Sequence, residues 1–154
     1  MKKIASFLLV LLVFNSCSEN VKFNDVAFQA LKNTAFWKAP QYTVTVAKNG
    51  SLTIEGINAN ELLTLETTSA NKGNYVIGNG AVIQATYNII ENGVENNFAT
   101  GISEDKGFVK ITKYDGATIS GEFEFKAINE DLGADQLYVD FKKGYFNNLP
   151  VTKL

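Results

Sequence analysis

Apolar and polar residues alternate with a period of two along most of the chain from about residue 25 onward, and turn residues interrupt the pattern at short intervals. In residues 117–128, Ile119, Phe123 and Phe125 share one face, while Glu122 and Glu124 share the other. Such alternation is typical of antiparallel strands with one face in a core and one in water. No run of ten residues has convincing helical spacing. Further strands are expected at 26–32, 61–68, 74–78, 82–91 and 136–143, beside two hairpins within 42–56 and 108–128. The pattern therefore predicts an all-β fold, an antiparallel sandwich or partly closed barrel of about 8–10 short strands joined by hairpins.

The later hairpin contains Asp115-Gly116 between its two strands. A two-residue loop at this position would set apolar residues opposite polar ones. A three-residue loop over 114–116 instead pairs Ile111 with Ile119, so that both face the core. We therefore expect the longer loop, with Gly116 left-handed in a bulge.

The earlier hairpin follows the same reasoning. A loop over residues 48–50 pairs Val46 with Leu52, whereas a two-residue loop would pair an apolar residue with a polar one. The stretch 91–107 is polar and interrupted by glycines, and we expect it to be a long mobile loop.

The N-terminus has the pattern of a secretory signal. Two lysines precede the uncharged run 4–14, which is too short to span a membrane and matches the apolar region of a signal peptide. Cys17 is the only cysteine of the chain and lies directly after this run. Cleavage after Ser18 by a common signal peptidase is one interpretation, and acylation of Cys17 as the first residue of a lipoprotein is the other. We adopt the second: residues 1–16 form a lipoprotein signal peptide, 17–24 carry the lipidated Cys17 and a short tether, and 25–154 form a single β domain.

Acylation would determine the localisation of the protein. Each buried methylene contributes about 0.8 kcal/mol, so two or three acyl chains, such as palmitate, make an anchor nearly permanent. We expect a lipid-anchored protein of the cell envelope, on the outer membrane of a Gram-negative cell, with the periplasmic and surface leaflets left as alternatives. With Cys17 acylated, no cysteine remains for a disulfide or for thiol chemistry.

Charge limits the classes of partner and of catalytic site. All 14 basic residues are lysines, and the chain has no arginine and no histidine. Without the two lysines of the signal peptide, 12 lysines face 16 carboxylates, a net charge of −4. This composition lacks the excess of basic residues that is typical of nucleic-acid-binding proteins. It also excludes a Ser-His-Asp triad, a Cys-His dyad and a zinc site of ordinary ligands.

Carboxylates, lysines, tyrosines and serines are the side chains that remain for chemistry, and the carboxylates form two clusters. Glu122 and Glu124 are two apart on the polar face of one strand, a spacing compatible with the paired carboxylates of a glycosidase, although solvated strands carry such pairs routinely. Glu130, Asp131 and Asp135 surround a glycine, as in loops that bind Ca²⁺, but their spacing does not match the calcium-loop motif, and a solvated loop is the simpler interpretation. We assign no catalytic residue, no metal site and no cofactor.

Aromatic residues suggest two further sites. Phe36 and Trp37 are adjacent, so in a strand they point to opposite sides. One belongs in the core, and Trp37 is a weak candidate for stacking against a ligand. Several tyrosines could line the cavity of a barrel, although tyrosine is also an ordinary strand residue. The tyrosines in question are Tyr42, Tyr75, Tyr87, Tyr138 and Tyr145.

Three stretches resemble the blocks of one sequence pattern. "FQALKNTAFWKA" at 28–39 resembles an F-x-A-x-x-N-G-x-x-W-x-A opening, with Thr34 in place of the glycine. "GFVKITKYDGATISGEFEFKA" and "KGYFNNLPV" resemble the later blocks of the same pattern. In these blocks the chain is similar to a family of small, uncharacterised all-β lipoproteins of Bacteroidota. The resemblance covers most of residues 26–151, and it implies the fold and the location in the cell envelope but no activity and no site residue.

Anchor, tether and β scaffold together lead to a functional hypothesis. We expect a non-catalytic binding or interaction module, because binding residues tend to lie on the loops of such scaffolds. Its expected partners are the membrane, through the lipid anchor, and an envelope protein or a glycan, without nucleic acid. One alternative is a carrier of a small hydrophobic ligand or glycan in a β cavity, and a weaker one is a carboxylate-dependent glycan hydrolase.

Overall fold

The computed structural model describes residues 26–78, 83–101, 107–131 and 133–154. These residues form twelve strands and no helix, so the predicted all-β class is confirmed, with more strands than the eight to ten expected. The strands are β1 (Ala27–Lys32), β2 (Ala35–Lys38), β3 (Gln41–Val46), β4 (Leu52–Asn58), β5 (Glu61–Thr67), β6 (Gly73–Ile77), β7 (Ala85–Glu91), β8 (Val94–Ala99), β9 (Gly107–Tyr114), β10 (Thr118–Asn129), β11 (Tyr138–Pro150) and β12 (Thr152–Lys153).

The predicted signal peptide, Cys17 and tether lie outside the described residues. Within the described ranges, no helix has the length and apolar character needed to cross a membrane.

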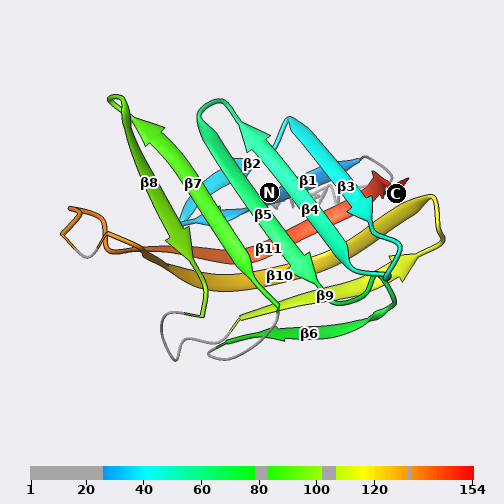
Figure 1. The fold of residues 1–154 in the computed structure, drawn as a ribbon. Helices are drawn as coiled ribbons and strands as arrows, with labels where there is room; N and C mark the ends of the chain where they lie inside the picture. Colours follow the sequence, from blue (N-terminus) through cyan, green and yellow to red (C-terminus); the bar gives the residue numbers. More distant parts are fainter. Residues whose placement is uncertain (1–25, 79–82, 102–106, 132) are drawn as a thin grey trace, which may run out of the picture.

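All twelve strands belong to one mostly antiparallel sheet that is not closed into a barrel. The strand order is β12-β3-β4-β5-β7-β8-β10-β11-β1-β2, with β9 beside β10 and β6 beside β9. We call β12, β3, β4, β5, β7 and β8 the first half, and β10, β11, β1, β2, β9 and β6 the second half. Figure 1 shows the long strands of the first half crossing in front of the second half, so that the two inner faces enclose one core.

The two halves are joined by a short seam between β8 and β10. Among the described residues, two pairs form it, Ala99 with Ile128 and Phe98 with Asn129, and the N–H of Glu130 donates to the carbonyl of Asn97 next to them. Every strand pairing is antiparallel except that of β12 with β3. A sheet that narrows to two pairs at this point is able to bend there, which brings the halves face to face.

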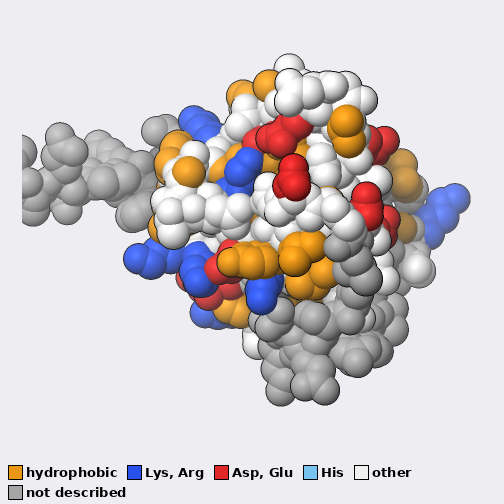
Figure 2. Space-filling model, turned by 90° about the vertical axis from the view of Figure 1, so that its left-hand side faces the viewer, with side chains coloured by type: hydrophobic (Ala, Val, Ile, Leu, Met, Phe, Trp, Pro, Cys, Tyr) orange, Lys and Arg blue, Asp and Glu red, His pale blue; other side chains and the backbone are white. Residues whose placement is uncertain are grey.

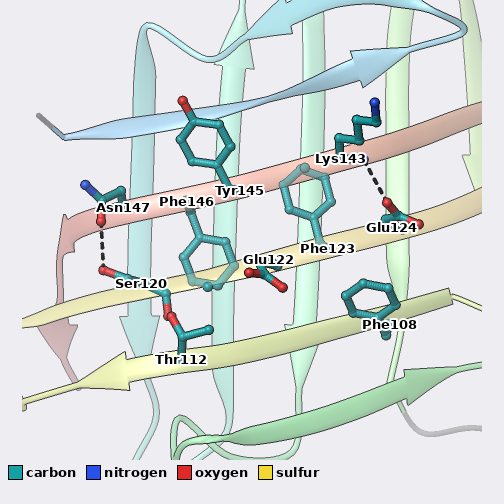
Figure 3. Close-up of a pocket in the computed structure, with 12 residues that line it drawn as sticks. Phe108, Thr112, Ser120, Glu122, Phe123, Glu124, Lys143, Tyr145, Phe146 and Asn147 are labelled. Atoms are coloured by element: carbon teal, nitrogen blue, oxygen red, sulfur yellow. Dashed lines mark hydrogen bonds between the residues drawn. The ribbon is translucent and has the colours of Figure 1, made fainter. Parts of the chain in front are cut away.

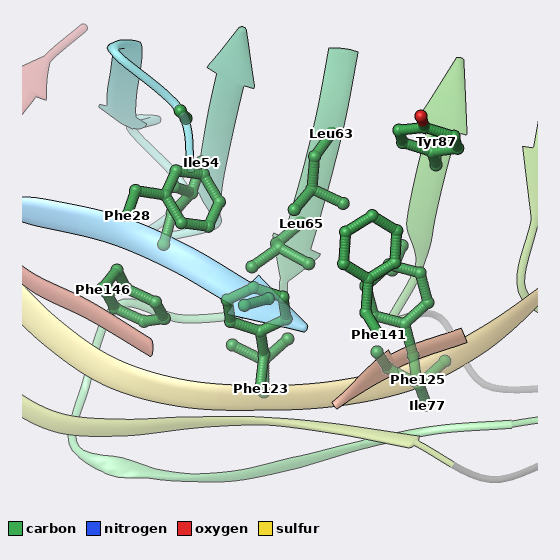
Figure 4. Close-up of a cluster of buried hydrophobic side chains, with 14 of the residues drawn as sticks. Phe28, Ile54, Leu63, Leu65, Ile77, Tyr87, Phe123, Phe125, Phe141 and Phe146 are labelled. Atoms are coloured by element: carbon green, nitrogen blue, oxygen red, sulfur yellow. The ribbon is translucent and has the colours of Figure 1, made fainter. Parts of the chain in front are cut away.

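Aromatic rings fill the space between the halves (Figure 4). Tyr87 from β7 contacts Phe141 from β11, with ring centroids 5.3 Å apart. Phe28 from β1 lies over Gly56 of β4, where an added Cβ would come within 2.6 Å of its ring. Aromatic pairs at these separations contribute about 0.5–1.5 kcal/mol beyond the burial of their area. Ring packing therefore holds the halves together where no backbone hydrogen bonds join them.

The first half follows the period-two pattern without interruption. Val46 pairs with Leu52, as predicted from the loop at 48–50, and Gly50 has a positive φ of 87°. None of the described pairings β3–β4, β4–β5, β5–β7 and β7–β8 contains a register shift. Uninterrupted alternation fixes the register, because a slip of one residue would expose the whole core face.

The β9–β10 hairpin departs from the predicted register. Gly116 has the expected left-handed conformation, with φ of 85°, but the predicted pairing of Ile111 with Ile119 is wrong. Ile111 pairs with Gly121, and Ile119 pairs with Tyr114. The register shifts between Ser120 and Gly121, opposite Thr112, so one extra residue on β9 moves the pairing.

Two further bulges interrupt β11 opposite β10. Lys143 and Asn148 have positive φ values of 50° and 49°. The freed N–H of Lys143 donates to Glu124 Oε1 at 3.0 Å, and that of Asn148 donates to Ser120 Oγ at 2.9 Å. Each bulge is thus completed by a side chain of the facing strand, which offsets the cost of an unpaired donor.

Two glycines make room for core aromatic rings in the same region. A Cβ on Gly121 would lie 2.4 Å from the Phe146 ring, and one on Gly144 would lie 2.5 Å from the Phe123 ring. Both glycines pair directly with the strand position of the ring that covers them. Glycine is required here for close packing.

Three strands were not predicted. β2 and β12 lie outside the predicted segments, and β8 lies within 91–107, where a long loop was expected; residues 102–106 of that stretch lie outside the described residues. Asn92 and Gly93, with φ of 52° and 79°, form a two-residue hairpin turn between β7 and β8. Asn-Gly is a strong signal for such a turn, but the polar residues of β8 hide its alternation.

Candidate functional site

An open groove of about 440 Å³ lies on the outer face of β9, β10 and β11. Figure 3 shows it between Tyr145 on β11 and Phe108 on β9, with Glu122 and Glu124 of β10 between them. Its remaining wall includes Thr112, Ser120, Lys143 and Asn147, together with the backbone around Gly121 and Gly144. We call this feature the β9–β11 groove.

Two rows of outward positions cross the groove. In one row, Lys110, Glu122 and Tyr145 stand at paired positions of β9, β10 and β11. In the other, Phe108 pairs with Glu124, which is bound by the backbone of Lys143. Each row thus has a carboxylate at its centre, with an aromatic residue on one side and a lysine on the other, and the order is reversed between rows.

The predicted carboxylate pair therefore lies in a groove, on the outer face of β10. Glu122 forms an ion pair with Lys110 at 3.4 Å, and the two side chains are 55% and 50% exposed. Glu124 is half-buried and holds the bulge at Lys143. One carboxylate is solvated and the other already accepts a backbone hydrogen bond, an arrangement suited to binding hydroxyl or amide donors.

A second polar cluster lies between the halves. Glu61 on β5 forms an ion pair with Lys32 on β1 and accepts a hydrogen bond from the indole N–H of Trp37 on β2. Lys32 Nζ also donates to the Tyr87 hydroxyl at 2.7 Å, and Asn58 donates to Glu61 at 3.4 Å. We call these five residues the Glu61 cluster. Because its members come from both halves, it ties β1 and β2 to β5 and β7.

The environment of Tyr87 follows from this cluster. Its side chain is 1% exposed, and burial raises the pKa of its hydroxyl above the ordinary value; the charge of Glu61 raises it further. The phenol therefore stays protonated and neutral, and Lys32 lies 5.0 Å from its ring centroid.

The Glu61 cluster was not predicted, although the sequence contains a signal for it. In the period-two pattern, Glu61 falls on the same strand face as the core residues Leu63 and Leu65. Lys32 likewise falls on the same face as the core residue Phe28. A charged residue at a core-facing position needs a buried partner.

The aromatic pair of β2 divides as expected, with one ring inward and one outward. Trp37 is 2% exposed and packs against Phe28 and Phe141, with ring centroids 5.6 and 5.7 Å away. Phe36 is 66% exposed. A ring as buried as Trp37 offers no free face to a ligand in this conformation.

The acidic stretch that was considered for Ca²⁺ forms a local turn. Asp131 Oδ1 accepts from the N–H of Gly133 at 2.9 Å, and Glu130 N–H donates to the carbonyl of Asn97. Asp135 is exposed. Within the described ranges, no group of three His, Cys, Asp or Glu side chains is arranged to hold a metal ion.

The five tyrosines considered for a cavity do not converge on one. Tyr87 lies in the interior, Tyr42 and Tyr75 pack at the border of the core, Tyr138 is 51% exposed, and Tyr145 faces outward over the groove. On the side of the molecule drawn in Figure 2, lysines and carboxylates are interspersed with hydrophobic side chains.

Residues 24–150 match the model of a family described as Domain of unknown function (DUF6252). Searches of curated proteins and of solved structures gave no match.

Proposed function

The chain belongs to the DUF6252 family, and we propose that it is a membrane-anchored lipoprotein of the cell envelope that acts as a non-catalytic binding module. The β9–β11 groove carries this proposal, because it combines solvated polar groups and aromatic side chains in one concave surface. Bulges border the groove, and bulges are common next to functional sites.

The arrangement of groups favours binding over catalysis. A hydrolase acting through two carboxylates needs one that is desolvated enough to hold a proton. Glu122 is 55% exposed, and the half-buried Glu124 accepts a hydrogen bond from the Lys143 N–H. The partly buried Glu61, outside the groove, is engaged by Lys32 and Trp37. A surface site is likewise favoured over an internal carrier cavity, because aromatic rings occupy the described interior.

Three observations support the proposed membrane localisation: Cys17, the apolar run before it, and the resemblance to small lipoproteins of Bacteroidota. We expect the wild-type protein to start at Cys17 and to carry acyl chains, as measured by mass spectrometry of its N-terminal peptide. The Cys17→Ala variant is expected to fold, yet to lose the acyl chains and the membrane association. A wild-type protein that starts at Glu19 and carries no lipid would contradict this localisation.

Site-specific cross-linking in intact cells tests the binding function. A photoreactive amino acid in place of Tyr145 is expected to give a specific covalent adduct with an envelope component. The same amino acid in place of Thr64, on the outer face of the first half, is the matched control and is expected to give none. Absence of an adduct at position 145, or equal labelling at both positions, would overturn the binding function.

A further inference from the structure

We propose that the ligand of the β9–β11 groove is a neutral saccharide, an inference that rests on the binding function proposed above. Four observations support this ligand class: the balance of charge in the groove, its aromatic walls, the spacing of its carboxylates and the rigidity of its backbone.

The charges in and beside the groove balance. Glu122 and Glu124 contribute two negative charges to the lining, and Lys143 contributes one positive charge. Lys110, beside the groove, supplies the second positive charge through its ion pair with Glu122. A site for an anion or a cation would carry an excess of the opposite charge. Carboxylates accept hydrogen bonds and lysines donate them, so together they match hydroxyl groups, which do both.

The aromatic walls supply the apolar contact that sugars require. Tyr145 and Phe108 are both half-buried on the outer face, on opposite sides of β10 (Figure 3). The C–H groups of a pyranose ring pack against an aromatic face through dispersion and burial of apolar area. Each ring stands beside a carboxylate. The ring therefore provides an apolar contact, and the neighbouring carboxylate provides a polar contact, to the same sugar unit.

The groove has the dimensions of a site for more than one sugar unit. Its volume of about 440 Å³ is within the range of small-molecule sites. Glu122 and Glu124 are two residues apart on one strand, about 7 Å at the usual rise per residue. Successive units of an oligosaccharide are therefore able to meet different carboxylates.

The backbone of the groove is fixed before any ligand binds. Thr112 Oγ1 donates to the carbonyl of Ser120 at 3.1 Å, and Ser120 and Glu124 hold the two bulges of β11. A preformed site loses little entropy on binding, which matters for a ligand with weak individual contacts.

Binding of short neutral oligosaccharides of glucose, mannose, galactose and N-acetylglucosamine tests the proposal. Each oligosaccharide is titrated into the acylated full-length protein in a detergent without a sugar headgroup, and calorimetry measures the affinity. We expect at least one of these oligosaccharides to bind. Tyr145→Ala is expected to weaken that binding about tenfold or more, while Tyr145→Phe, which keeps the ring, stays within about threefold of wild type. Glu122→Gln is expected to cost about tenfold, because it removes a charged acceptor.

Two matched variants control for effects outside the groove. Phe36→Ala removes an exposed aromatic ring from β2, and Glu66→Gln neutralises an exposed carboxylate of the first half. Both are expected to bind as wild type does. Thermal unfolding of every variant establishes that it is folded.

Two results would overturn the saccharide proposal: no oligosaccharide of the panel binds, or Tyr145→Ala binds as tightly as wild type. The cross-linking experiment separates this failure from failure of the binding function. An adduct at position 145 with a protein, without sugar binding, would leave the binding module intact and refute the ligand class. Absence of both would refute both.

Discussion

Both halves of the sheet consist of strands with an apolar inner face, but their outer faces differ in regularity. In the first half, threonine and glutamate occupy outward positions in regular ladders, such as Thr43, Glu55, Thr64 and Thr86 across four strands. In the second half, register shifts interrupt the pairings of β1 with β11, β10 with β11 and β9 with β10. The first arrangement gives a solvated ladder, and the second gives the β9–β11 groove.

The bulges make the second half the part of the fold with an irregular outer surface. A regular ladder gains about 0.2–1 kcal/mol from each cross-strand pair. Bulges forgo some of these pairs and need extra acceptors, which Ser120 and Glu124 supply. Departures from local rules that are compensated by specific side chains are the expected places for function.

Removing the glycine that permits the irregular half should have the largest effect. In Gly121→Ala, the added Cβ would lie 2.3 Å from the Lys110 carbonyl and 2.4 Å from the Phe146 ring. Because backbone and a buried ring must both move, we expect a loss of about 3 kcal/mol or more in the free energy of unfolding. Urea denaturation measures it.

Gly73→Ala on β6 is the matched control. Its Cβ would meet no atom closer than 3.6 Å, so we expect a change within about 0.5 kcal/mol. Equal stability of the two variants would show that the close approach at Gly121 is not what shapes the second half.

Breaking the tie between the halves should have the next largest effect. Glu61→Ala leaves Lys32 and the Trp37 N–H without their acceptor. Lys32 is 22% exposed, so water takes over part of the lost interaction, and we expect a loss of about 2–3 kcal/mol. Equilibrium unfolding measures it, with Glu66→Ala on the solvated face of the same strand as control.

A double variant separates the pair from the packing around it. Lys32→Met with Glu61→Leu removes both charges, and we expect it to be more stable than Glu61→Ala alone, because no unpaired charge remains between the halves. If Glu61→Ala is no more destabilising than Glu66→Ala, the cluster does not tie the halves together.

The sequence predicts the regular half far better than the irregular half. The pairing of Val46 with Leu52 follows from alternation alone, because nothing interrupts it. The pairing of Ile111 with Ile119 fails, because the extra residue Thr112 leaves no trace in the hydrophobic pattern. The position of a one-residue bulge is determined by the tertiary packing against both strands, and not by the local sequence pattern.

The candidate site was predictable only in part, for the same reason. Glu122 and Glu124 are recognisable as an outward carboxylate pair. That Tyr145 and Phe108 flank them depends on the register of two bulged pairings. Likewise, the core-facing parity of Glu61 indicates that it needs a partner, but not which of the lysines comes from the other half to meet it.

Each half contains a two-residue hairpin turn with two positive φ values, and exchanging their residues tests the cost of the turn. Thr34, in the β1–β2 turn, has φ of 74°, a strained conformation for a β-branched side chain. Gly93 adopts φ of 79° at the same place in the β7–β8 turn. We expect Thr34→Gly to stabilise the protein by about 0.5–1 kcal/mol and Gly93→Thr to destabilise it by about 1 kcal/mol, as thermal unfolding would show. Changes of the opposite sign would mean that contacts of the Thr34 side chain outweigh backbone strain.

The smallest effect concerns the longer hairpin turns, one in each half. Asp115 Oδ1, in the β9–β10 turn, accepts from the N–H groups of Ala117 and Thr118 at 3.0 and 2.7 Å. These hydrogen bonds lower the pKa of Asp115 below its ordinary value. Asn49, in the β3–β4 turn, makes the corresponding contact to Ser51 with a neutral amide.

The two turns should therefore respond differently to acid. A carboxyl with a lowered pKa contributes stability above its unfolded pKa of about 4, and the contribution is lost as the pH falls through the lower folded pKa. We expect unfolding free energies measured between about pH 5 and pH 2 to fall less steeply in Asp115→Asn than in wild type. The reciprocal Asn49→Asp variant is expected to fall more steeply, because its new carboxylate accepts from the same N–H. Identical slopes in all three proteins would show that these turn contacts, although present in both halves, do not distinguish them energetically.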